Sequence, residues 1–455
     1  MRLNMLWMTA VLSVLGCSGP SLTSETLEGQ RCDSRGFIDW VTDQAIEIDD
    51  LIPSNGSGYG TGVRNAVGQA RVVGLGESRH DTREQLLLKS GMVRFLVEEM
   101  GFRALILEES VPHTLALDDY VLTGEGDLRG VMNRLAGWYL WDTEEMYELV
   151  AWIRGFNEGR GPDDQVRIFG MDITAPALGV EAVLDFLRAT GVDLETNDGS
   201  LGLELQDGDF WPTTWQRYST LSDGRKAALT AEYNALIDVV DEHRHLLTAR
   251  SSEREYERYR WFAEVGRLGH QMFSTSDRAQ GGAIREHGMV QSLLWILENE
   301  MADQKAVLWA HNLHVAKSVF RMPGLVEGDL EPMGVELARE LGDSYVAIGG
   351  SFGSGSYPHD LPPGERSFEV MAESTMDGAL AGVNIPIYMV DLRKAAKDTA
   401  ATMWLQEERE WRAQDLNSVL VPGEAFDLVY FMSEISRSAP MPSALERFQE
   451  LQRQQ

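Results

Sequence analysis

Acid–base side chains recur directly after four short apolar segments of the chain. They are Glu77 and His80 after the first segment, Glu108 at the end of the second, Asp172 after the third, and His311 and His314 after the fourth. A neutral imidazole can take a proton from water, and a nearby carboxylate orients the ring and stabilises the imidazolium. This set of residues therefore favours hydrolysis by activated water.

The pattern leaves the individual roles open. His80 fits the role of the base with Glu77 or Glu108 as its partner, while His311 or His314 would polarise a carbonyl or protonate a leaving alcohol. Histidine and carboxylate side chains also bind zinc, so a divalent metal is a competing interpretation. Because the sequence has no His-Glu-x-x-His motif and no paired Cys-x-x-Cys motif, we predict no metal ligands and no cofactor.

A formal match to a serine-hydrolase motif is set aside. Residues 349–353 read Gly-Gly-Ser-Phe-Gly, which fits the Gly-x-Ser-x-Gly elbow and follows an apolar segment. The elbow requires a helix directly after it, but Ser354-Gly355-Ser356-Tyr357-Pro358 does not have a helical pattern. We therefore expect no serine nucleophile.

The segments that carry these residues predict the fold. Seven short runs are apolar on both faces, as in strands covered on both sides, and helical patterns such as 83–100, 143–157 and 178–189 lie between several of them. The predicted strands are 71–75, 104–107, 166–169, 306–309, 345–348, 387–390 and 428–431. The alternation indicates an α/β fold with a mainly parallel β-sheet flanked by helices on both faces. Ligands of such sheets bind beyond the carboxyl ends of the strands, where the acid–base residues should meet.

One long interval interrupts the alternation. Between Asp172 and Ala306 we find no strand pattern, whereas 225–250, 253–273 and 283–300 have apolar residues at helical spacing. We interpret about 178–300 as a large helical insertion or cap.

Composition and charge limit the class of partner. The chain has 455 residues, 43% of them hydrophobic, which is enough for a sizeable core. Its 40 basic and 71 acidic residues give a net charge of −31, so nucleic acid is a poor partner. Two cysteines exclude a disulfide-stapled scaffold.

The N-terminus has the pattern of a targeting signal. After Met1 and Arg2 comes an apolar run, 3–15, which is too short to span a bilayer and ends just before Cys17. It resembles a bacterial lipoprotein signal, in which the cysteine becomes the lipidated first residue, although an ordinary secretory signal is the alternative. We expect a signal peptide at 1–16, a lipid-anchored tether at 17–35 and a hydrolase domain at 36–455. The chain would then be exported and held at the cell envelope, in the outer membrane or periplasm.

The order of the motifs resembles the erythromycin esterase family. The similar segments are Gly74-Leu75-Gly76-Glu77-Ser78-Arg79-His80-Asp81-Thr82-Arg83-Glu84, Trp141-Asp142-Thr143-Glu144-Glu145 with Trp152 to Asn157, Gly170-Met171-Asp172, Trp309-Ala310-His311-Asn312-Leu313-His314-Val315, and Pro332-Met333-Gly334. The resemblance extends from about Val72 to Phe431, which is nearly the whole mature chain.

The resemblance implies a hydrolase, in the best-known members a macrolide lactone esterase, that uses histidine-activated water without a covalent intermediate. Carried over to this sequence, it makes His80 the base and Glu77 its partner. Glu108 is the second carboxylate, and His311 and His314 support the site. We expect substrate-binding roles for a further set, which comprises Arg83, Lys89, Asp172 and Arg285.

This chain departs from the family pattern at four positions. Asp81 replaces a glycine, Lys89 stands where arginine is usual, and Glu286 and Ser292 replace Asp and Asn. These changes bear on the substrate more than on the reaction class.

We therefore expect cleavage of a carboxylic ester or macrolactone, a small-molecule substrate, with macrolide resistance as an open question. Two alternatives remain. One is a lipoprotein that binds haem, metal or a macrocycle without turnover, and the other is a metal-dependent hydrolase.

Overall fold

The computed structural model describes residues 34–53, 59–133, 135, 141–192, 211–360, 363–443 and 445–446. The expected signal peptide, Cys17 and nearly all of the tether lie outside these residues, so export and lipidation stay predictions. Within the described ranges, no helix combines the length and the apolar character needed to cross a bilayer.

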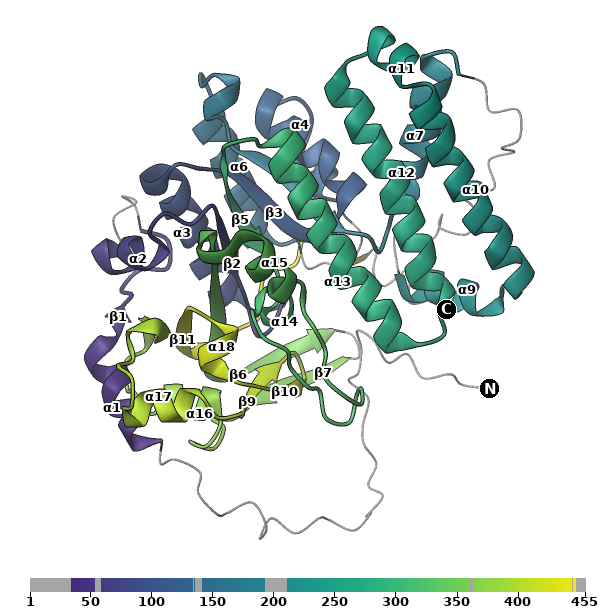
Figure 1. Cartoon of the computed structure of the whole chain (residues 1–455). Coiled ribbons are helices and arrows are strands. Elements are labelled where there is room, and N and C mark those ends of the chain that lie inside the picture. Colours follow the sequence, from purple (N-terminus) through teal and green to yellow (C-terminus); the bar gives the residue numbers. More distant parts are fainter. Residues whose placement is uncertain are drawn as a thin grey trace.

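A mainly parallel β-sheet forms the centre of the molecule (Figure 1). In the described residues it has nine strands, in the order β1-β8-β11-β6-β2-β5-β3-β4, with β7 paired to β6. The pairs from β11 to β4 along this order are parallel, while β1–β8, β8–β11 and β6–β7 are antiparallel. The strands are β1 (Ile46–Glu47), β2 (Val72–Leu75), β3 (Phe102–Ser110), β4 (Arg167–Asp172), β5 (Lys305–Trp309), β6 (Tyr345–Asp360), β7 (Pro363–Phe368), β8 (Ile387–Asp391) and β11 (Leu428–Ile435).

All seven strands expected from the sequence are present, but the sequence analysis missed β1, β7 and a small separate hairpin. The hairpin pairs β9 (Arg409–Ala413) with β10 (Leu416–Leu420). The missed strands lie at edges or outside the main sheet and are short or rich in polar residues. An apolar-run criterion detects strands that are buried on both faces, so it does not detect these.

Helices cover both faces of the sheet, as the sequence predicts. Alternating strand side chains divide between two cores: Val73 and Leu105 face one, while Val72 and Ile106 face the other. The first face is covered by α2 (Gly60–Val67), α3 (Arg83–Met100), α4 (Leu115–Thr123), α5 (Leu128–Met132) and α6 (Glu144–Asn157). The second is covered by α1 (Arg35–Gln44), α13 (Arg278–Trp295), α14 (Asn312–Val315), α15 (Met333–Leu341), α16 (Met376–Ala381) and α17 (Ala400–Leu405).

The described residues between β4 and β5 form helices and the loops that connect them, with no strand. The helices include α7 (Ala177–Ala189), α9 (Trp211–Thr220), α10 (Asp223–Glu242), α11 (Arg244–Arg250), α12 (Glu253–Ser274) and α13. The pattern at 225–250 corresponds to two helices that divide at His243. Ser222, Ser252 and Asp277 cap the N-termini of α10, α12 and α13 with side-chain oxygens. Helices α7, α10, α11 and α12 form a bundle beside the sheet with its own core, and α13 lies between bundle and sheet (Figure 1).

Asn312 connects the strand ends that carry the acid–base residues. It begins α14, its Nδ2 donates to the carbonyl of Gly350 in β6 at 2.7 Å, and its Oδ1 accepts from the Gly350 amide at 2.8 Å. Gly76 must be glycine here, because a Cβ would lie 2.4 Å from Asn312 Oδ1. The side chain therefore fixes the ends of β2, β5 and β6 relative to one another.

Asn312→Ala should lower the free energy of unfolding by about 1–3 kcal/mol, because it leaves the buried Gly350 amide without its acceptor. Urea unfolding of both proteins measures the difference. Asn299→Ala, at an exposed asparagine, is the matched control and should change stability by less than about 0.5 kcal/mol. Equal effects of the two substitutions would contradict the assigned role.

Candidate active site

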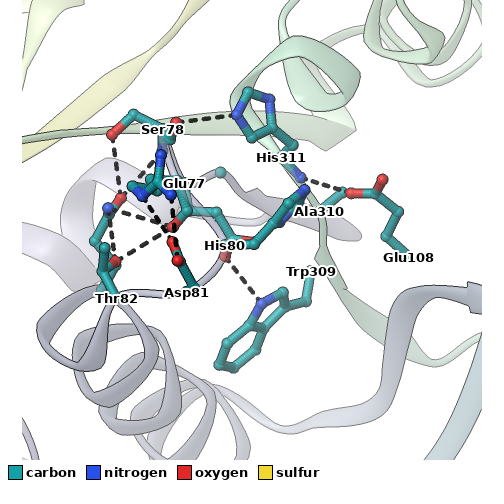
Figure 2. A network of polar contacts seen from close by, with 12 residues as sticks. Glu77, Ser78, His80, Asp81, Thr82, Glu108, Trp309, Ala310 and His311 are labelled. Atoms are coloured by element: carbon teal, nitrogen blue, oxygen red, sulfur yellow. Dashed lines mark hydrogen bonds and ion pairs between the residues drawn. The ribbon is translucent and has the colours of Figure 1, made fainter. Parts of the chain in front are cut away.

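The acid–base residues predicted from the sequence meet at the carboxyl edge of the sheet. Strands β2, β5, β3 and β4 are consecutive neighbours, and each delivers its residues at this edge. Figure 2 shows Glu77 and His80 from the loop after β2, His311 at the N-cap of α14 and Glu108 near the end of β3 in one network of polar contacts. The structure thus brings Glu77, His80, Glu108, Asp172, His311 and His314 together.

Glu77 is the buried centre of this arrangement. Its Oε1 lies 2.7 Å from Nδ1 of His80, and its Oε2 accepts a hydrogen bond of 3.1 Å from the indole of Trp309. The same Oε2 accepts from the ammonium of Lys89. Only 1% of Glu77 is exposed, so these three partners replace water around the carboxylate.

His80 contacts Glu77 and is itself mostly buried. Its side chain is 13% exposed, and its ring centre is 5.1 Å from that of His311. Because Nδ1 faces Glu77, Nε2 is the ring nitrogen on the opposite side, away from the carboxylate. This is the arrangement of a histidine that is oriented by a carboxylate and presents its second nitrogen to a ligand.

Lys89 lies beneath Glu77 and has no exposed surface. Its ammonium contacts Glu77, lies 4.5 Å from the centre of a Trp309 ring and is 3.3 Å from the carbonyl oxygen of Ala310. Burial lowers the pKa of Lys89 to about 8, against the opposing attraction of Glu77. Lys89 is fully enclosed by protein atoms, so its ammonium has no surface for a direct contact with a ligand, and its expected substrate-binding role stays a prediction.

His311 is held as a neutral ring. Its Nε2 lies 3.1 Å from the carbonyl oxygen of Ser78, which requires a proton on that nitrogen, and its Nδ1 accepts from the amide of Leu313 at 3.1 Å. Burial, reinforced by the neighbouring His80, holds the pKa of His311 well below its usual range. Its backbone amide donates to Glu108 Oε2 at 2.9 Å, as Figure 2 shows.

Glu108 lies between two cationic groups. Its Oε1 is 3.0 Å from Nε2 of His314 and 2.9 Å from Nη2 of Arg285, which also pairs with Asp172 at 2.7 Å. Burial alone would raise the pKa of Glu108, but His314 and Arg285 outweigh it and hold the pKa well below its usual range. Arg285 comes from α13, so the helical interval contributes directly to the site.

Arg83 is the predicted site residue that lies apart. It begins α3, its side chain is 56% exposed, and it pairs with Glu145 of α6 at 3.5 Å. No contact among the described residues joins it to the cluster around Glu77. Its expected substrate-binding role stays a prediction.

Asp81 fixes the loop that carries His80. Its carboxylate pairs with Arg79 at 2.7 Å and accepts from the Tyr357 hydroxyl at 3.1 Å. Arg79 is itself buried and pairs with Asp415, next to the β9–β10 hairpin. Both neighbours of His80 are therefore attached to segments from the C-terminal part of the chain.

Sequence reasoning missed several residues that complete the site. Trp309 donates to Glu77, Glu286 contacts Nδ1 of His314 at 2.7 Å, and Arg79 with Tyr357 holds the His80 loop. Trp309 is the last residue of a predicted strand, and an inspection of strand termini would have found it. Tyr357 lies more than 270 residues from Arg79 in sequence and carries no local signal.

A metal site was one alternative for these side chains. Within the described ranges, no group of three or more His, Cys, Asp or Glu side chains has an arrangement that could hold a metal ion. The acid–base residues pair instead with one another and with Lys89 and Arg285.

Comparisons with known proteins agree with the resemblance in the motifs. The model of the erythromycin esterase family matches residues 97–435. Erythromycin esterase type II of Escherichia coli is 25% identical over 389 residues, which cover 80% of this chain and 90% of that protein. Erythromycin esterase type I of the same organism is 22% identical over 81% of this chain and 92% of its own length.

Solved structures show the same fold. A Bacillus cereus protein superposes with a TM-score of 0.75 at 24% identity and covers 90% of this chain and 99% of its own. A mutant erythromycin esterase in its open conformation superposes with a TM-score of 0.64 at 16% identity, with 82% and 93% covered.

The pairing of Lys89 with Glu77 can be tested by a double-mutant cycle. Lys89→Met should lower the free energy of unfolding by about 3–5 kcal/mol, because it leaves a buried carboxylate without its cation. Adding Glu77→Gln should recover part of this loss, with a coupling energy of about 0.5–3 kcal/mol. Chemical denaturation of the four proteins gives the result, and strictly additive losses would refute the pairing.

Proposed function

Because the chain belongs to the erythromycin esterase family, we propose that it hydrolyses a carboxylic ester or macrolactone with water activated by His80. Family membership supports a hydrolase of the esterase type. The observation that carries the finer proposal is the contact of 2.7 Å between His80 Nδ1 and Glu77 Oε1. It presents Nε2 as a base and supplies the carboxylate that stabilises the ring once it is protonated.

In the proposed reaction a water molecule gives a proton to Nε2 of His80, and its oxygen forms a bond to the carbonyl carbon. The carbonyl π electrons move to oxygen to give a tetrahedral oxyanion. When the carbonyl re-forms, the bond from carbon to the ester oxygen breaks, and the His80 imidazolium returns the proton to the leaving alkoxide. The products are an acid and an alcohol, and a lactone gives both in one opened chain.

The supporting residues have complementary tasks in this scheme. Glu77 orients His80 and stabilises its charged form, and Lys89 and Trp309 hold Glu77 in place. Arg285 and His314 pair with Glu108 at the edge of the sheet and offset its negative charge near the reacting carbonyl. His311 lies beside His80 as a neutral ring, so it adds no positive charge that would oppose protonation of His80.

A macrolide lactone is the first substrate to examine, because two relatives are named erythromycin esterases. Incubation with the purified protein should add the mass of one water molecule to the lactone. His80→Ala should lower kcat by roughly 10²–10⁴-fold, the usual contribution of a general base, with folding retained. Mass spectrometry of the product and circular dichroism of the variant measure both.

His287→Ala is the matched control, because His287 is an exposed histidine that pairs with Glu336 on the surface. It should retain wild-type turnover. A chelator added in parallel should leave turnover unchanged, whereas inactivation with rescue by a divalent ion would favour a metal-dependent hydrolase. Full activity in His80→Ala would remove His80 as the base, and no reaction with any of a panel of esters would reject the proposed function.

A further inference from the structure

His314 lies between two carboxylates that come from different elements. Its Nε2 is 3.0 Å from Oε1 of Glu108, at the end of β3, and its Nδ1 is 2.7 Å from Oε1 of Glu286, on α13. The His314 side chain is only 12% exposed, so water does little to separate these charges. Each ring nitrogen thus lies within 3.0 Å of an anionic oxygen, at ion-pair distance. The angles are not those of hydrogen bonds, since Nδ1 has no hydrogen-bond partner among the described residues and the hydrogen bond at Nε2 comes from Arg285 Nη1.

A count of protons decides the state of this ring. A neutral imidazole carries one N–H, so one of its two nitrogens would direct a lone pair at a carboxylate oxygen. The imidazolium carries a proton on both nitrogens and places its positive charge beside both Glu108 and Glu286. The geometry is therefore favourable for the charged ring and unfavourable for either neutral tautomer.

The remaining neighbours of His314 are consistent with this charge. The charged and titratable groups around it are Glu108 from β3, Arg285 and Glu286 from α13, and His311 at the N-cap of α14. Asp172 from β4 pairs with Arg285, and His80 from the loop after β2 lies next to His311. The three carboxylates of this set face one arginine, so a charged His314 reduces the uncompensated negative charge. Arg285 Nη1 also lies 3.3 Å from His314 Nε2, and a neutral ring could accept from it. In that neutral state the lone pair of His314 Nε2 would lie 3.0 Å from the Glu108 carboxylate oxygen, and the two would repel each other.

We propose that Glu286 is a positioning residue that, together with Glu108, keeps His314 as a fixed imidazolium. His314 then supplies constant positive charge beside Glu108 and does not exchange a proton with the substrate. The catalytic role of the His314 charge rests on the proposed function, whereas the protonation state of His314 is a property of the folded protein. The proton that leaves water is consequently returned to the alkoxide by His80.

The electrostatic balance supports the same assignment. Burial would lower the pKa of His314, but Glu108 and Glu286 outweigh it and raise the pKa to about 10. Because this pKa lies above the unfolded value of about 6.5, the interaction stabilises the fold fully below about pH 6.5. The stabilisation is lost as pH rises toward the folded-state pKa.

Glu286 also has a purely structural contact, which the test must separate from its charge. Its Oε2 accepts from the backbone amide of Met333 at 2.8 Å, at the start of α15. Glu286→Gln keeps an oxygen for this amide and removes the negative charge. A structural role would survive that substitution, and the electrostatic role would not.

Histidine NMR of the full protein tests the proposal without reference to activity. The Cε1–H signals of the nine histidines are followed from pH 5 to 10, and His314→Gln identifies the signal of His314. We expect the His314 signal of the wild type to stay at its imidazolium position through pH 8. In Glu286→Gln its pKa should fall by roughly 1–3 units, as for loss of one adjacent opposite charge.

Glu336→Gln is the matched control, because it removes a carboxylate from the exposed His287–Glu336 pair between the same helices, α13 and α15. Glu336→Gln should leave the His314 titration unchanged. Glu286→Asp keeps a carboxylate at position 286, so the pKa of His314 in this variant should lie close to the wild-type value. A wild-type His314 that titrates near pH 6.5 would overturn the proposal even if Glu286→Gln fails to fold. Equal shifts in Glu286→Gln and Glu336→Gln would overturn it as well.

The pH dependence of turnover gives a second readout. In Glu286→Gln, kcat should fall as pH rises through the lowered pKa of His314, and this alkaline decrease should be absent from the wild type over the same range. A pH-independent loss of activity would indicate a structural role and would contradict the proposal. If no ester is hydrolysed, the proposed function fails while the NMR titration still decides the charge of His314.

Discussion

The buried carboxylate of Glu77 is the interaction on which the site depends. A carboxylate removed from water is stable only when hydrogen bonds and a cation replace its hydration. Trp309 and Lys89 provide these at one oxygen, which leaves the other oxygen for His80. Removing any of these partners would shift the Glu77 carboxylate or change its protonation state. The orientation of the His80 ring would then change as well.

The register of the parallel strands explains why these partners meet. Trp309 at the end of β5 is aligned with Leu75 of β2 on one side and with Leu107 of β3 on the other. The residues that follow these aligned positions therefore lie side by side, with Glu77 after β2 and Glu108 in β3 on either side of His311 after β5. Backbone hydrogen bonds reinforce the alignment, since the Asn312 amide donates to the carbonyl of Glu77 at 2.8 Å. The backbone pairing of the strands therefore sets the spacing of the acid–base groups, independently of side-chain contacts.

The sequence predicts this part of the structure well, because buried parallel strands are nearly continuous apolar runs and their termini are polar. The seven predicted strands, six of which belong to the parallel part of the sheet, and the carboxyl edge with Glu77, Glu108 and His311 follow from that pattern. The edge strand β7 and the hairpin β9–β10 do not, since their polar residues resemble loops. Contacts such as Arg79 with Tyr357 depend on how distant segments pack, and no local pattern encodes them.

The three histidines of the site illustrate what sequence cannot supply. All three follow strand ends, and residue type alone makes each a potential acid or base. Their surroundings differ. His311 has a carbonyl and an amide at its two nitrogens, and His314 has two carboxylates. His80 has one carboxylate at Nδ1 and no hydrogen bond at Nε2 among the described residues. A ring between a hydrogen-bond acceptor and a donor is fixed as one neutral tautomer, and a ring between two anions is fixed as a cation. In the proposed mechanism His80 is the ring that accepts a proton and releases it, so three side chains of the same type would differ in role because their neighbours differ.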